Sequence, residues 1–242
     1  METLYDALVQ AGRLLLSANR AVLDVVLLSF RVSGTALLLS IVLGIPVGCA
    51  LALSRFRGRG LLVALVYTGF ALPPIVIGLL VHILLSRSGP LGALELLYTP
   101  AAMIIAQTLL AAPYVAGISL AAVQAVPADV RSQAAALGAS RMRALWMHVR
   151  EARIGLVAAV VAGFGAVISE VGAVMLVGGN LRGETRVMTT AILLEARRGE
   201  YETALAFGLI LLALAFLVNF ALTRLQQGRH AAWTARSSRR WE

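Results

Sequence analysis

The sequence contains no lysine, since all 21 of its basic residues are arginines. A P-loop that binds ATP and an enzyme that works through a Schiff base both need the lysine ammonium group, so the chain can supply neither. Charge is scarce as well: 14% of the 242 residues are charged, against about 25% in ordinary soluble domains. With 60% hydrophobic residues and a mean hydropathy of +0.86, the composition is that of an integral membrane protein.

Cysteine and histidine are too few and too scattered for a metal centre or a disulfide framework. Cys49 is the only cysteine and lies in an apolar run, while His82, His148 and His230 fall in three different segments. We therefore predict no metal site and, without paired acids or a Ser-His set in the apolar segments, no catalytic residues. The net charge of +9 does not indicate nucleic-acid binding, because the arginines lie mostly in short loops and in the tail.

Five apolar stretches are long enough to cross the hydrocarbon core of a bilayer, which is about 30 Å thick and needs about 20 helical residues. They are residues 33–53, 61–85, 101–126, 156–177 and 204–223. These stretches predict an all-α integral membrane domain over residues 32–223, with about five transmembrane helices.

Residues 1–31, before the first stretch, predict an amphipathic helix that lies in the membrane interface. Polar residues recur there on one helical stripe among leucines and valines. They are Arg13, Ser17, Arg20, Asp24 and Arg31. A cleaved signal peptide is the alternative, but the N-terminus carries two acids and no basic region. At the other end, residues 224–242 predict a basic cytoplasmic tail that is disordered or rests on anionic lipid headgroups.

The arginines also predict the orientation of the chain. Residues 54–60 contain three arginines, residues 127–155 contain five and the tail from Arg224 contains five, which makes thirteen on one side of the membrane against eight on the other. Because positively charged loops stay in the cytoplasm, we expect these segments and the C-terminus inside and the N-terminus outside. The chain is then a multi-pass protein of the cell (inner) membrane.

Residues 127–155 form the one long polar segment between the apolar stretches. Pro127 and Asp129 suit the start of a helix, and the alanines that follow favour its continuation. Gly138 with its small neighbours favours a tight bend before a second helix. Small residues at such a bend let another protein approach the backbone closely. A helical hairpin that only stabilises the bundle is the alternative interpretation.

In this polar segment the chain resembles the permease subunits of ABC importers. In that family a cytoplasmic loop that reads Glu-Ala-Ala, three variable residues and Gly forms the coupling helix, which sits in a cleft of the ATP-binding subunit. Aligned on Gly138, this chain has Ser132, Gln133 and Ala134 in place of Glu-Ala-Ala. The residues that the resemblance assigns to coupling are Ser132, Gln133, Ala134, Ala135, Leu137, Gly138, Ala139 and Ser140.

The resemblance extends from about Leu28 to Phe220. The segment VSGTALLLSIVLGIPVGCALA of this chain resembles the first core helix of these permeases. The segment ALPPIVIGLLVHILLSRSGPLG resembles the molybdate and tungstate branch of the family. Oxyanion permeases in general have a segment similar to ISEVGAVMLVGGN. Tungstate permeases are most similar to GGNLRGETRVMTTAI and YTPAAMIIAQTLLAAPYVAG, so tungstate is expected before molybdate or another oxyanion.

The resemblance implies the type I ABC importer permease fold, with this chain as the membrane pathway for the oxyanion rather than an enzyme. It further implies a homodimer of permeases, two copies of a separate subunit that binds ATP and Mg, and an extracytoplasmic binding protein that delivers the anion. No cofactor is expected on this chain itself. A secondary transporter and a membrane scaffold are the alternatives, but five stretches without an internal repeat do not favour the former.

Polar residues and prolines inside the apolar stretches admit a functional and a structural role. Glu170 is the only acid there, and a charge at the bilayer centre costs on the order of 2.5–3.5 kcal/mol, so we favour a hydrogen-bonded structural role over gating. Prolines act as hinges or packing kinks, and amide or hydroxyl side chains bridge helices. The candidates for the pathway or its gate are Pro73, Pro74, Gln107, Thr108, Pro113, Ser169 and Glu170.

Residues 178–201 combine arginines with threonines, whose hydrogen-bond donors suit an oxyanion. We therefore expect Arg182 and Arg186 to receive the anion or to contact the binding protein. Ordinary solvation of a loop is the alternative, because four glutamates nearly neutralise the stretch. They are Glu184, Glu195, Glu200 and Glu202.

Overall fold

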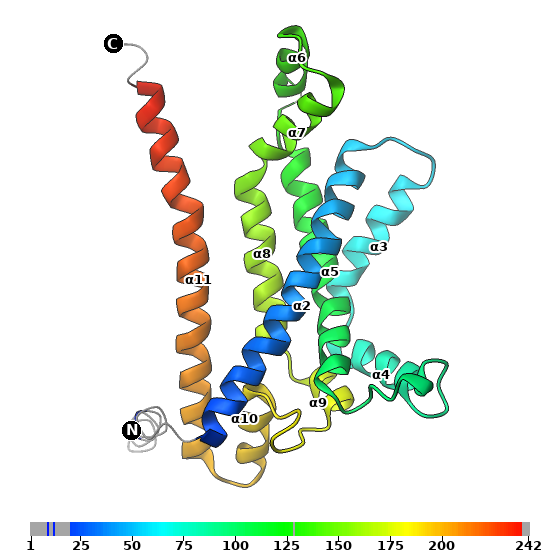
Figure 1. Ribbon diagram of the computed structural model, residues 1–242, viewed down its shortest axis with the longest axis vertical. Coiled ribbons are helices and arrows are strands. Elements are labelled where there is room, and N and C mark those ends of the chain that lie inside the picture. The colour runs from blue at the N-terminus through cyan, green and yellow to red at the C-terminus, as the bar shows by residue number, and fades with distance from the viewer. Residues whose placement is uncertain (1–8, 10–11, 13–19, 128, 239–242) are drawn as a thin grey trace.

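The structure is a computed structural model that describes residues 9, 12, 20–127 and 129–238, and every regular element in that part of the chain is helical (Figure 1). The N-terminal half contains α2 (Arg20–Leu53), α3 (Arg59–Ala71), α4 (Pro74–Leu85), the 3₁₀ helix η1 (Gly92–Leu94) and α5 (Pro100–Gln124). The C-terminal half contains α6 (Asp129–Ala136), α7 (Arg141–Glu151), α8 (Arg153–Ile168), α9 (Gly172–Gly178), α10 (Met188–Arg197) and α11 (Tyr201–Ser238). The predicted all-α fold is confirmed.

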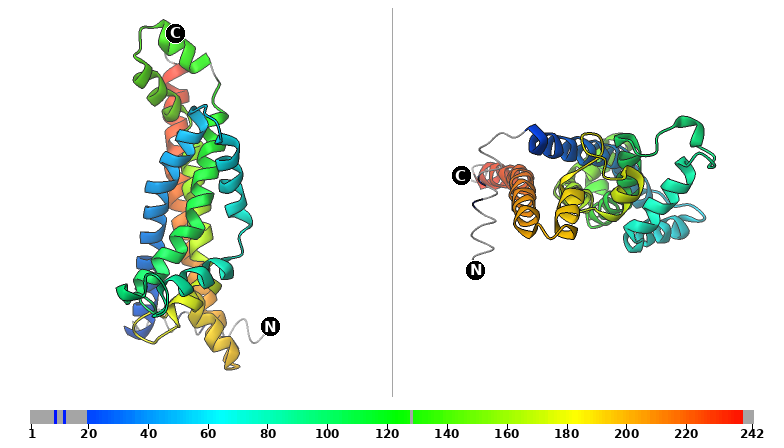
Figure 2. Two further views of the ribbon diagram at one scale, coloured as in Figure 1. Left: turned by 90° about the vertical axis from the view of Figure 1, so that its right-hand side faces the viewer. Right: turned by 90° about the horizontal axis from the view of Figure 1, so that it is seen from below.

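The central helix of the bundle is α5, which packs mainly against α2 and α8. Small residues allow α2 to approach it closely. A Cβ atom on Gly44 would lie 2.9 Å from the Cβ of Val115, and one on Gly48 would overlap the carbonyl of Ala116. Close backbone approach through glycine is the usual way in which membrane helices gain van der Waals contact. At the edge of the bundle α11 packs mainly against α10 (Figure 2).

Among the described residues, three single helices are long and apolar enough to cross a membrane: Val22–Leu53, Pro100–Gln124 and Tyr201–Arg224. They match three of the five predicted stretches. The predicted stretch over residues 61–85 is sharply bent at the prolines that were expected to act as a hinge or kink: α3 and α4 meet at an angle of 103° at Pro73-Pro74, where proline rings exclude regular helical bonding.

The fourth predicted stretch, residues 156–177, is also interrupted. Its helix α8 continues α7 across a bend of 57° and ends at Ile168, and α9 begins only at Gly172. Two bent pairs therefore accompany the three long helices, which gives up to five spans. The structure thus agrees with the predicted number of spans and moves their boundaries.

Both terminal predictions need adjustment. The first predicted helix does not end before the first span, because α2 runs unbroken for 34 residues. At 1.5 Å per residue it is about 51 Å long, so its N-terminal part extends beyond a hydrocarbon core about 30 Å thick. The rest of the predicted interfacial helix, including residues 13–19, lies outside the described residues. At the other end, α11 keeps residues 224–238 of the basic tail helical.

The two ends of the bundle carry different structures (Figure 1). One end, here called the α6–α7 end, holds α6, α7, the α2–α3 loop and the C-terminal part of α11 (Figure 2). The opposite end, here called the α9–α10 end, holds α4, α9, α10 and the start of α2. The arginine-rich segments that were expected on one side of the membrane therefore share one end.

Candidate functional site

At the α6–α7 end, the chain reverses through a hydrogen-bonded turn built on Gly138. The N–H of Gly138 donates to the carbonyl of Ala135 and the N–H of Ala139 donates to the carbonyl of Ala134, both at 3.0 Å. Gly138 has a φ angle of +81°, the left-handed conformation that such a helix end requires and that a side chain would strain. The predicted sequence of helix, tight bend and helix is confirmed.

The second helix, α7, is fixed at both of its ends. Ser140 caps its start by accepting a hydrogen bond from the N–H of Arg143 at 3.4 Å. Near its other end His148 is buried, and its Nε2 atom donates to the carbonyl of Val123 at the end of α5, at 3.2 Å. His148 therefore joins α7 to the central helix through a polar contact. Sequence reasoning missed this contact, because a single histidine matches no motif.

The residues that the sequence assigned to coupling mostly face outward. Ala134 is buried and Ala139 is half-buried, whereas the other six are exposed. Leu137 is 88% exposed, and on α7 the side chains of Met142 and Trp146 are 76% and 60% exposed. Large apolar side chains gathered at a polar end of the molecule are typical of a protein interface. Sequence reasoning missed Met142 and Trp146, whose exposure follows only from the packing of α7.

At the α9–α10 end, Glu170 occupies the break between α8 and α9. It is buried, and its Oε1 atom accepts a hydrogen bond of 2.7 Å from the N–H of Ala173 in the first turn of α9. Its own carbonyl accepts a hydrogen bond of 2.9 Å from the hydroxyl of Thr189 on α10. Glu170 thus ties three helices together, as expected for a bonded structural acid, while its neighbour Ser169 is exposed.

Of the other pathway candidates, Gln107 lies closest to this break. Its Nε2 atom donates to the carbonyl of Val167 at the end of α8, at 3.0 Å. The hydroxyl of Thr108 instead bonds within its own helix, to Ile104 at 2.7 Å. Of these two side chains, only that of Gln107 therefore bridges two helices.

The prolines divide between two places. Pro73 and Pro74 form the α3–α4 bend. Ile75 follows them directly, and a Cβ atom placed on Gly172 would lie 3.7 Å from the Cβ of Ile75. The bend therefore faces the break at Glu170. Pro113 lies elsewhere, on the part of α5 that packs against Gly69 of α3. The structure brings together Gln107, Ser169, Glu170 and the Pro73-Pro74 bend, and it leaves Pro113 apart.

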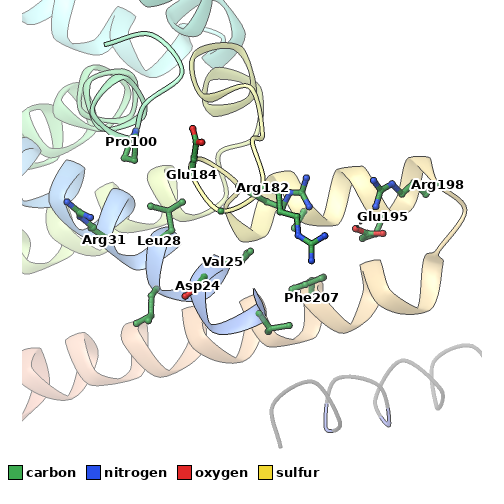
Figure 3. Close-up of a pocket in the computed structure, with 15 residues that line it drawn as sticks. Asp24, Val25, Leu28, Arg31, Pro100, Arg182, Glu184, Glu195, Arg198 and Phe207 are labelled. Carbon is green, nitrogen blue, oxygen red and sulfur yellow. Dashed lines mark hydrogen bonds and ion pairs between the residues drawn. The ribbon is translucent and has the colours of Figure 1, made fainter. Parts of the chain in front are cut away.

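A cleft of about 750 Å³ opens at the α9–α10 end between α2, α10, α11 and the loop that precedes α10 (Figure 3). Charged residues of both signs line it. The basic ones are Arg31, Arg182, Arg186 and Arg198, and the acidic ones are Asp24, Glu184 and Glu195. Arg182 and Arg186, which were selected from the sequence, therefore line the same cleft as Arg31 and Arg198.

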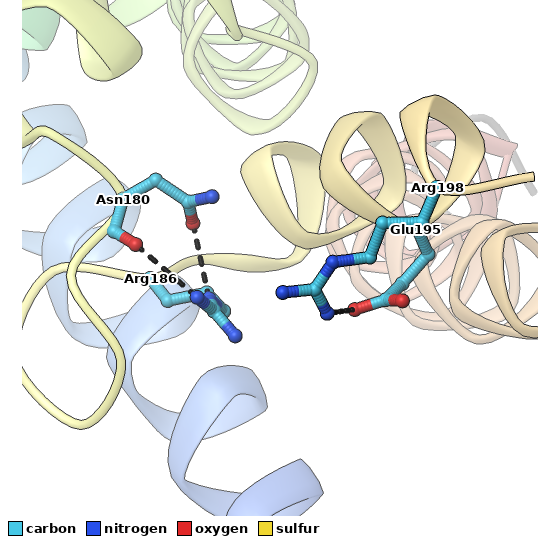
Figure 4. A network of polar contacts seen from close by, with 4 residues as sticks. All are labelled: Asn180, Arg186, Glu195 and Arg198. Carbon is cyan, nitrogen blue, oxygen red and sulfur yellow. Dashed lines mark hydrogen bonds and ion pairs between the residues drawn. The ribbon is translucent and has the colours of Figure 1, made fainter. Parts of the chain in front are cut away.

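Arg182 and Arg186, the two arginines expected to receive the anion or contact the binding protein, differ in their bonding, and Figure 4 shows the contacts of Arg186. Arg186 donates from Nε to the Oδ1 atom of Asn180 at 3.2 Å and from its terminal nitrogen to the Asn180 carbonyl at 3.4 Å. Arg182 is exposed and has no hydrogen bond or ion pair with another described residue. Arg198 and Glu195 form an ion pair of 3.4 Å, the one such pair in the part of the chain described. Arg182 and Arg31, which is also exposed and unbonded among the described residues, are the guanidinium groups of the cleft that are free to meet a ligand.

Comparison with known proteins gives a consistent result. The family model described as "Binding-protein-dependent transport system inner membrane component" matches residues 40–230. The chain is 47% identical over 196 residues to the probable anion ABC transporter permease protein of Haloferax volcanii, over 79% of this chain and 84% of that one. It is 39% identical over 227 residues to the tungstate uptake system permease protein TupB of Peptoclostridium acidaminophilum, over 94% of this chain and 100% of that one.

The fold is also similar to a solved structure, the inward-facing MetNI methionine ABC transporter. The TM-score is 0.65 at 20% sequence identity, and the match covers 85% of this chain and 94% of that chain. At this level of identity the likeness shows the fold, which is that of a type I ABC importer permease.

Proposed function

The chain belongs to the family of binding-protein-dependent transport system inner membrane components, and from that premise we propose that it carries tungstate inward as the permease subunit of an ABC importer. The relatives named as tungstate permeases match nearly its whole length, at 39% and 30% identity. Molybdenum permeases match at 30% identity over about four fifths of the chain, so molybdate is the alternative cargo.

The observation that carries the proposal is the exposed turn between α6 and α7. A leucine that is 88% exposed, at the tip of a turn fixed by Gly138, is poised to enter a cleft of a partner. In our proposal that partner is an ATP-binding subunit, of which two copies serve a permease homodimer. ATP and Mg are then held by the partner, because this chain has no lysine for a P-loop.

The orientation follows from the same end of the molecule. Eleven described arginines lie in residues 54–60, 127–155 and 224–238, segments that share one end of the bundle, which supports a cytoplasmic location for the α6–α7 end and the C-terminus. The cleft at the α9–α10 end then faces outward. There, Arg182, which has no hydrogen bond or ion pair among the described residues, meets the extracytoplasmic binding protein or the anion it delivers.

The test of the coupling role is co-purification of the tagged chain with ATP-binding subunits after gentle detergent extraction. Replacing Leu137 with Asp puts a charge into the proposed cleft, and we expect recovery of the ATPase to fall at least about tenfold, as for the loss of an interface anchor. Leu94→Asp is the matched control, because Leu94 is 56% exposed and lies at the opposite end. Equal recovery with both variants would show that the turn does not hold the ATPase, and recovery of no ATPase by the unmodified chain would overturn the importer assignment.

The cargo and the outer docking site are tested by uptake into cells that express the complete transporter. We expect tungstate uptake to exceed uptake of molybdate and sulfate. A preference for molybdate would change the assigned substrate and leave the assignment as an ABC importer permease in place. Arg182→Glu is expected to reduce uptake at low substrate, whereas Arg87→Glu, at an exposed arginine outside the cleft, is the control. Normal uptake by the Arg182 variant would exclude it from docking.

A further inference from the structure

A second cavity lies at the α6–α7 end, between the end of α2 and the α6–α7 turn. Its volume is about 990 Å³, and the α2–α3 loop forms one wall while the start of α7 forms the other. Arg55 contributes from the first wall and Arg141 from the second, and no acidic residue lines the cavity. This cavity is here called the arginine groove.

The two guanidinium groups of the arginine groove have no partner in the described part of the chain. Among the described residues neither Arg55 nor Arg141 makes a hydrogen bond or an ion pair, and both are exposed. Arg59, four residues further along the same loop, donates instead to the carbonyl of Leu51 at 2.7 Å. Unpaired guanidinium groups that converge on one cavity from two walls are an arrangement that suits a tetrahedral anion such as a phosphate group.

Apart from the two arginines, the residues that line the groove are alanines, leucines and one serine, Ser54, and two of them, Ala52 and Leu53, belong to the end of the first span. Leu53 is the last residue of α2, the helix that carries the first span, and Leu145 faces it from α7. Next to Arg55 in the loop, Phe56 is 48% exposed. Aromatic and arginine side chains directly beyond the end of a span are typical of the depth at which lipid headgroups lie. The arginine groove therefore offers cations for a phosphate and apolar side chains for the part of a lipid below it.

We infer that the arginine groove binds the phosphate of an anionic phospholipid headgroup. The lipid would bridge the α2–α3 loop to the first turn of α7 and so hold the coupling turn against the bundle. The apolar lining and the position at the end of α2 favour a lipid over a free anion, which needs no apolar surface. The inference depends on the membrane location of the chain and not on which oxyanion it transports.

The experiment is a titration of the purified, delipidated full-length protein in neutral detergent, with binding read by native mass spectrometry. The probes are dioctanoyl phosphatidylglycerol and dioctanoyl phosphatidylcholine. We expect the phosphatidylglycerol to bind at least about fivefold more tightly, and Arg55→Gln and Arg141→Gln each to weaken it about fivefold, the value of one arginine near an anionic headgroup. Thermal unfolding of the variants should be unchanged, since both side chains are exposed.

Arg57→Gln is the matched control, because Arg57 is an exposed arginine of the same loop that does not line the groove. A loss with Arg57→Gln equal to that with Arg55→Gln would reduce the effect to net charge and overturn the site. Equal binding of the two lipids would overturn it as well. Inorganic phosphate or tungstate that displaces the phosphatidylglycerol at equal concentration would assign the groove to a free anion instead of a lipid.

Discussion

At the α6–α7 end, Leu137 and Trp146 remain largely exposed and Arg55 and Arg141 have no partner among the described residues, whereas at the α9–α10 end the polar groups beside the helix breaks are buried and bonded. There the hydroxyl of Thr190 both accepts from the N–H of Val187 at 3.1 Å and donates to its carbonyl at 3.0 Å. The first end is incomplete without other molecules, because exposed apolar groups and free cations gain stability on binding. The second end satisfies its own backbone where helices break.

The breaks explain why the α9–α10 end must be self-sufficient. Each interrupted helix leaves backbone groups without helical partners, and within a membrane an unsatisfied group costs several kcal/mol. Two side chains pair such backbone groups. The carboxylate of Glu170 accepts a hydrogen bond from the N–H of Ala173, and the hydroxyl of Ser29 accepts one from the N–H of Met188 at 2.8 Å. Substitutions of these buried, bonded groups should therefore lower stability, whereas substitutions of the exposed side chains at the α6–α7 end should lower partner binding.

The largest effect is expected from crowding the α4–α9 contact. A Cβ on Gly78 would lie 2.5 Å from the backbone of Ala173, so Gly78→Ala should destabilise the protein by about 1–3 kcal/mol, as overpacking does. Thermal unfolding in detergent measures the loss. Gly34→Ala is the control, since nothing lies within 4 Å of a Cβ there. If the two variants melt at the same temperature, the close contact of α4 with α9 is not formed.

Next in size is the removal of the Glu170 carboxylate. Glu170→Ala leaves the N–H of Ala173 unpaired and should lower stability by about 1–2 kcal/mol, whereas Glu170→Gln keeps an acceptor and should stay close to the unmodified protein. Unfolding and uptake are measured on both variants. A Gln variant that is stable but does not transport would show that the charge serves gating, contrary to the structural role favoured here.

Strain in the turn at the α6–α7 end should lower the affinity for the ATPase, whereas the two substitutions above lower stability. Gly138→Ala forces a side chain into a left-handed conformation that costs about 1–2 kcal/mol, which predicts a loss of ATPase affinity of up to about tenfold. Gly199 has a nearly equal φ of +82° and the same open surroundings at the α9–α10 end, so Gly199→Ala applies matched strain away from the partner. Affinity for the ATPase, measured on the purified complex, should fall only in the first variant, and an equal fall in both would remove the distinction between the ends.

The smallest effect is expected at the ion pair of the outer cleft. Arg198 and Glu195 lie three residues apart on a surface helix end, and the arginine side chain is 58% exposed. Arg198→Gln should therefore change the free energy of unfolding by less than about 0.5 kcal/mol. A larger loss, measured by thermal unfolding at low and high salt, would show that the cleft depends on its charges for stability.

Sequence reasoning was most accurate where a local rule acts. The turn at Gly138 was predicted because a helix that ends in a left-handed residue selects glycine. The break at Glu170 was not predicted, because residues 156–177 are uniformly apolar apart from that acid and hydropathy does not register a change of direction. The bend at Pro73-Pro74 had a visible cause in the sequence, yet its angle of 103° is set by the packing of α4 on α9.

The candidate site residues also divide into those that were predicted from the sequence and those that only the structure brings together. Leu137 was assigned through the resemblance to ABC importer permeases and Arg182 through its residue type, and both are exposed in the structure. The bonding of Arg186 to Asn180, the anchor formed by His148 and the convergence of Arg55 with Arg141 join residues that no local pattern connects. Such sites depend on which helices become neighbours.

The sequence alone determined that this chain is a helical membrane protein without a P-loop, with a polar helical turn between two apolar stretches and an arginine-rich side. Those properties follow from composition, from the length of apolar runs and from glycine at a helix end, and each acts within a few residues. Only the tertiary structure decided where the spans break, which polar groups are satisfied across helices and which arginines remain free. The reason is that hydrogen bonds and close contacts between helices depend on distances between segments far apart in the chain.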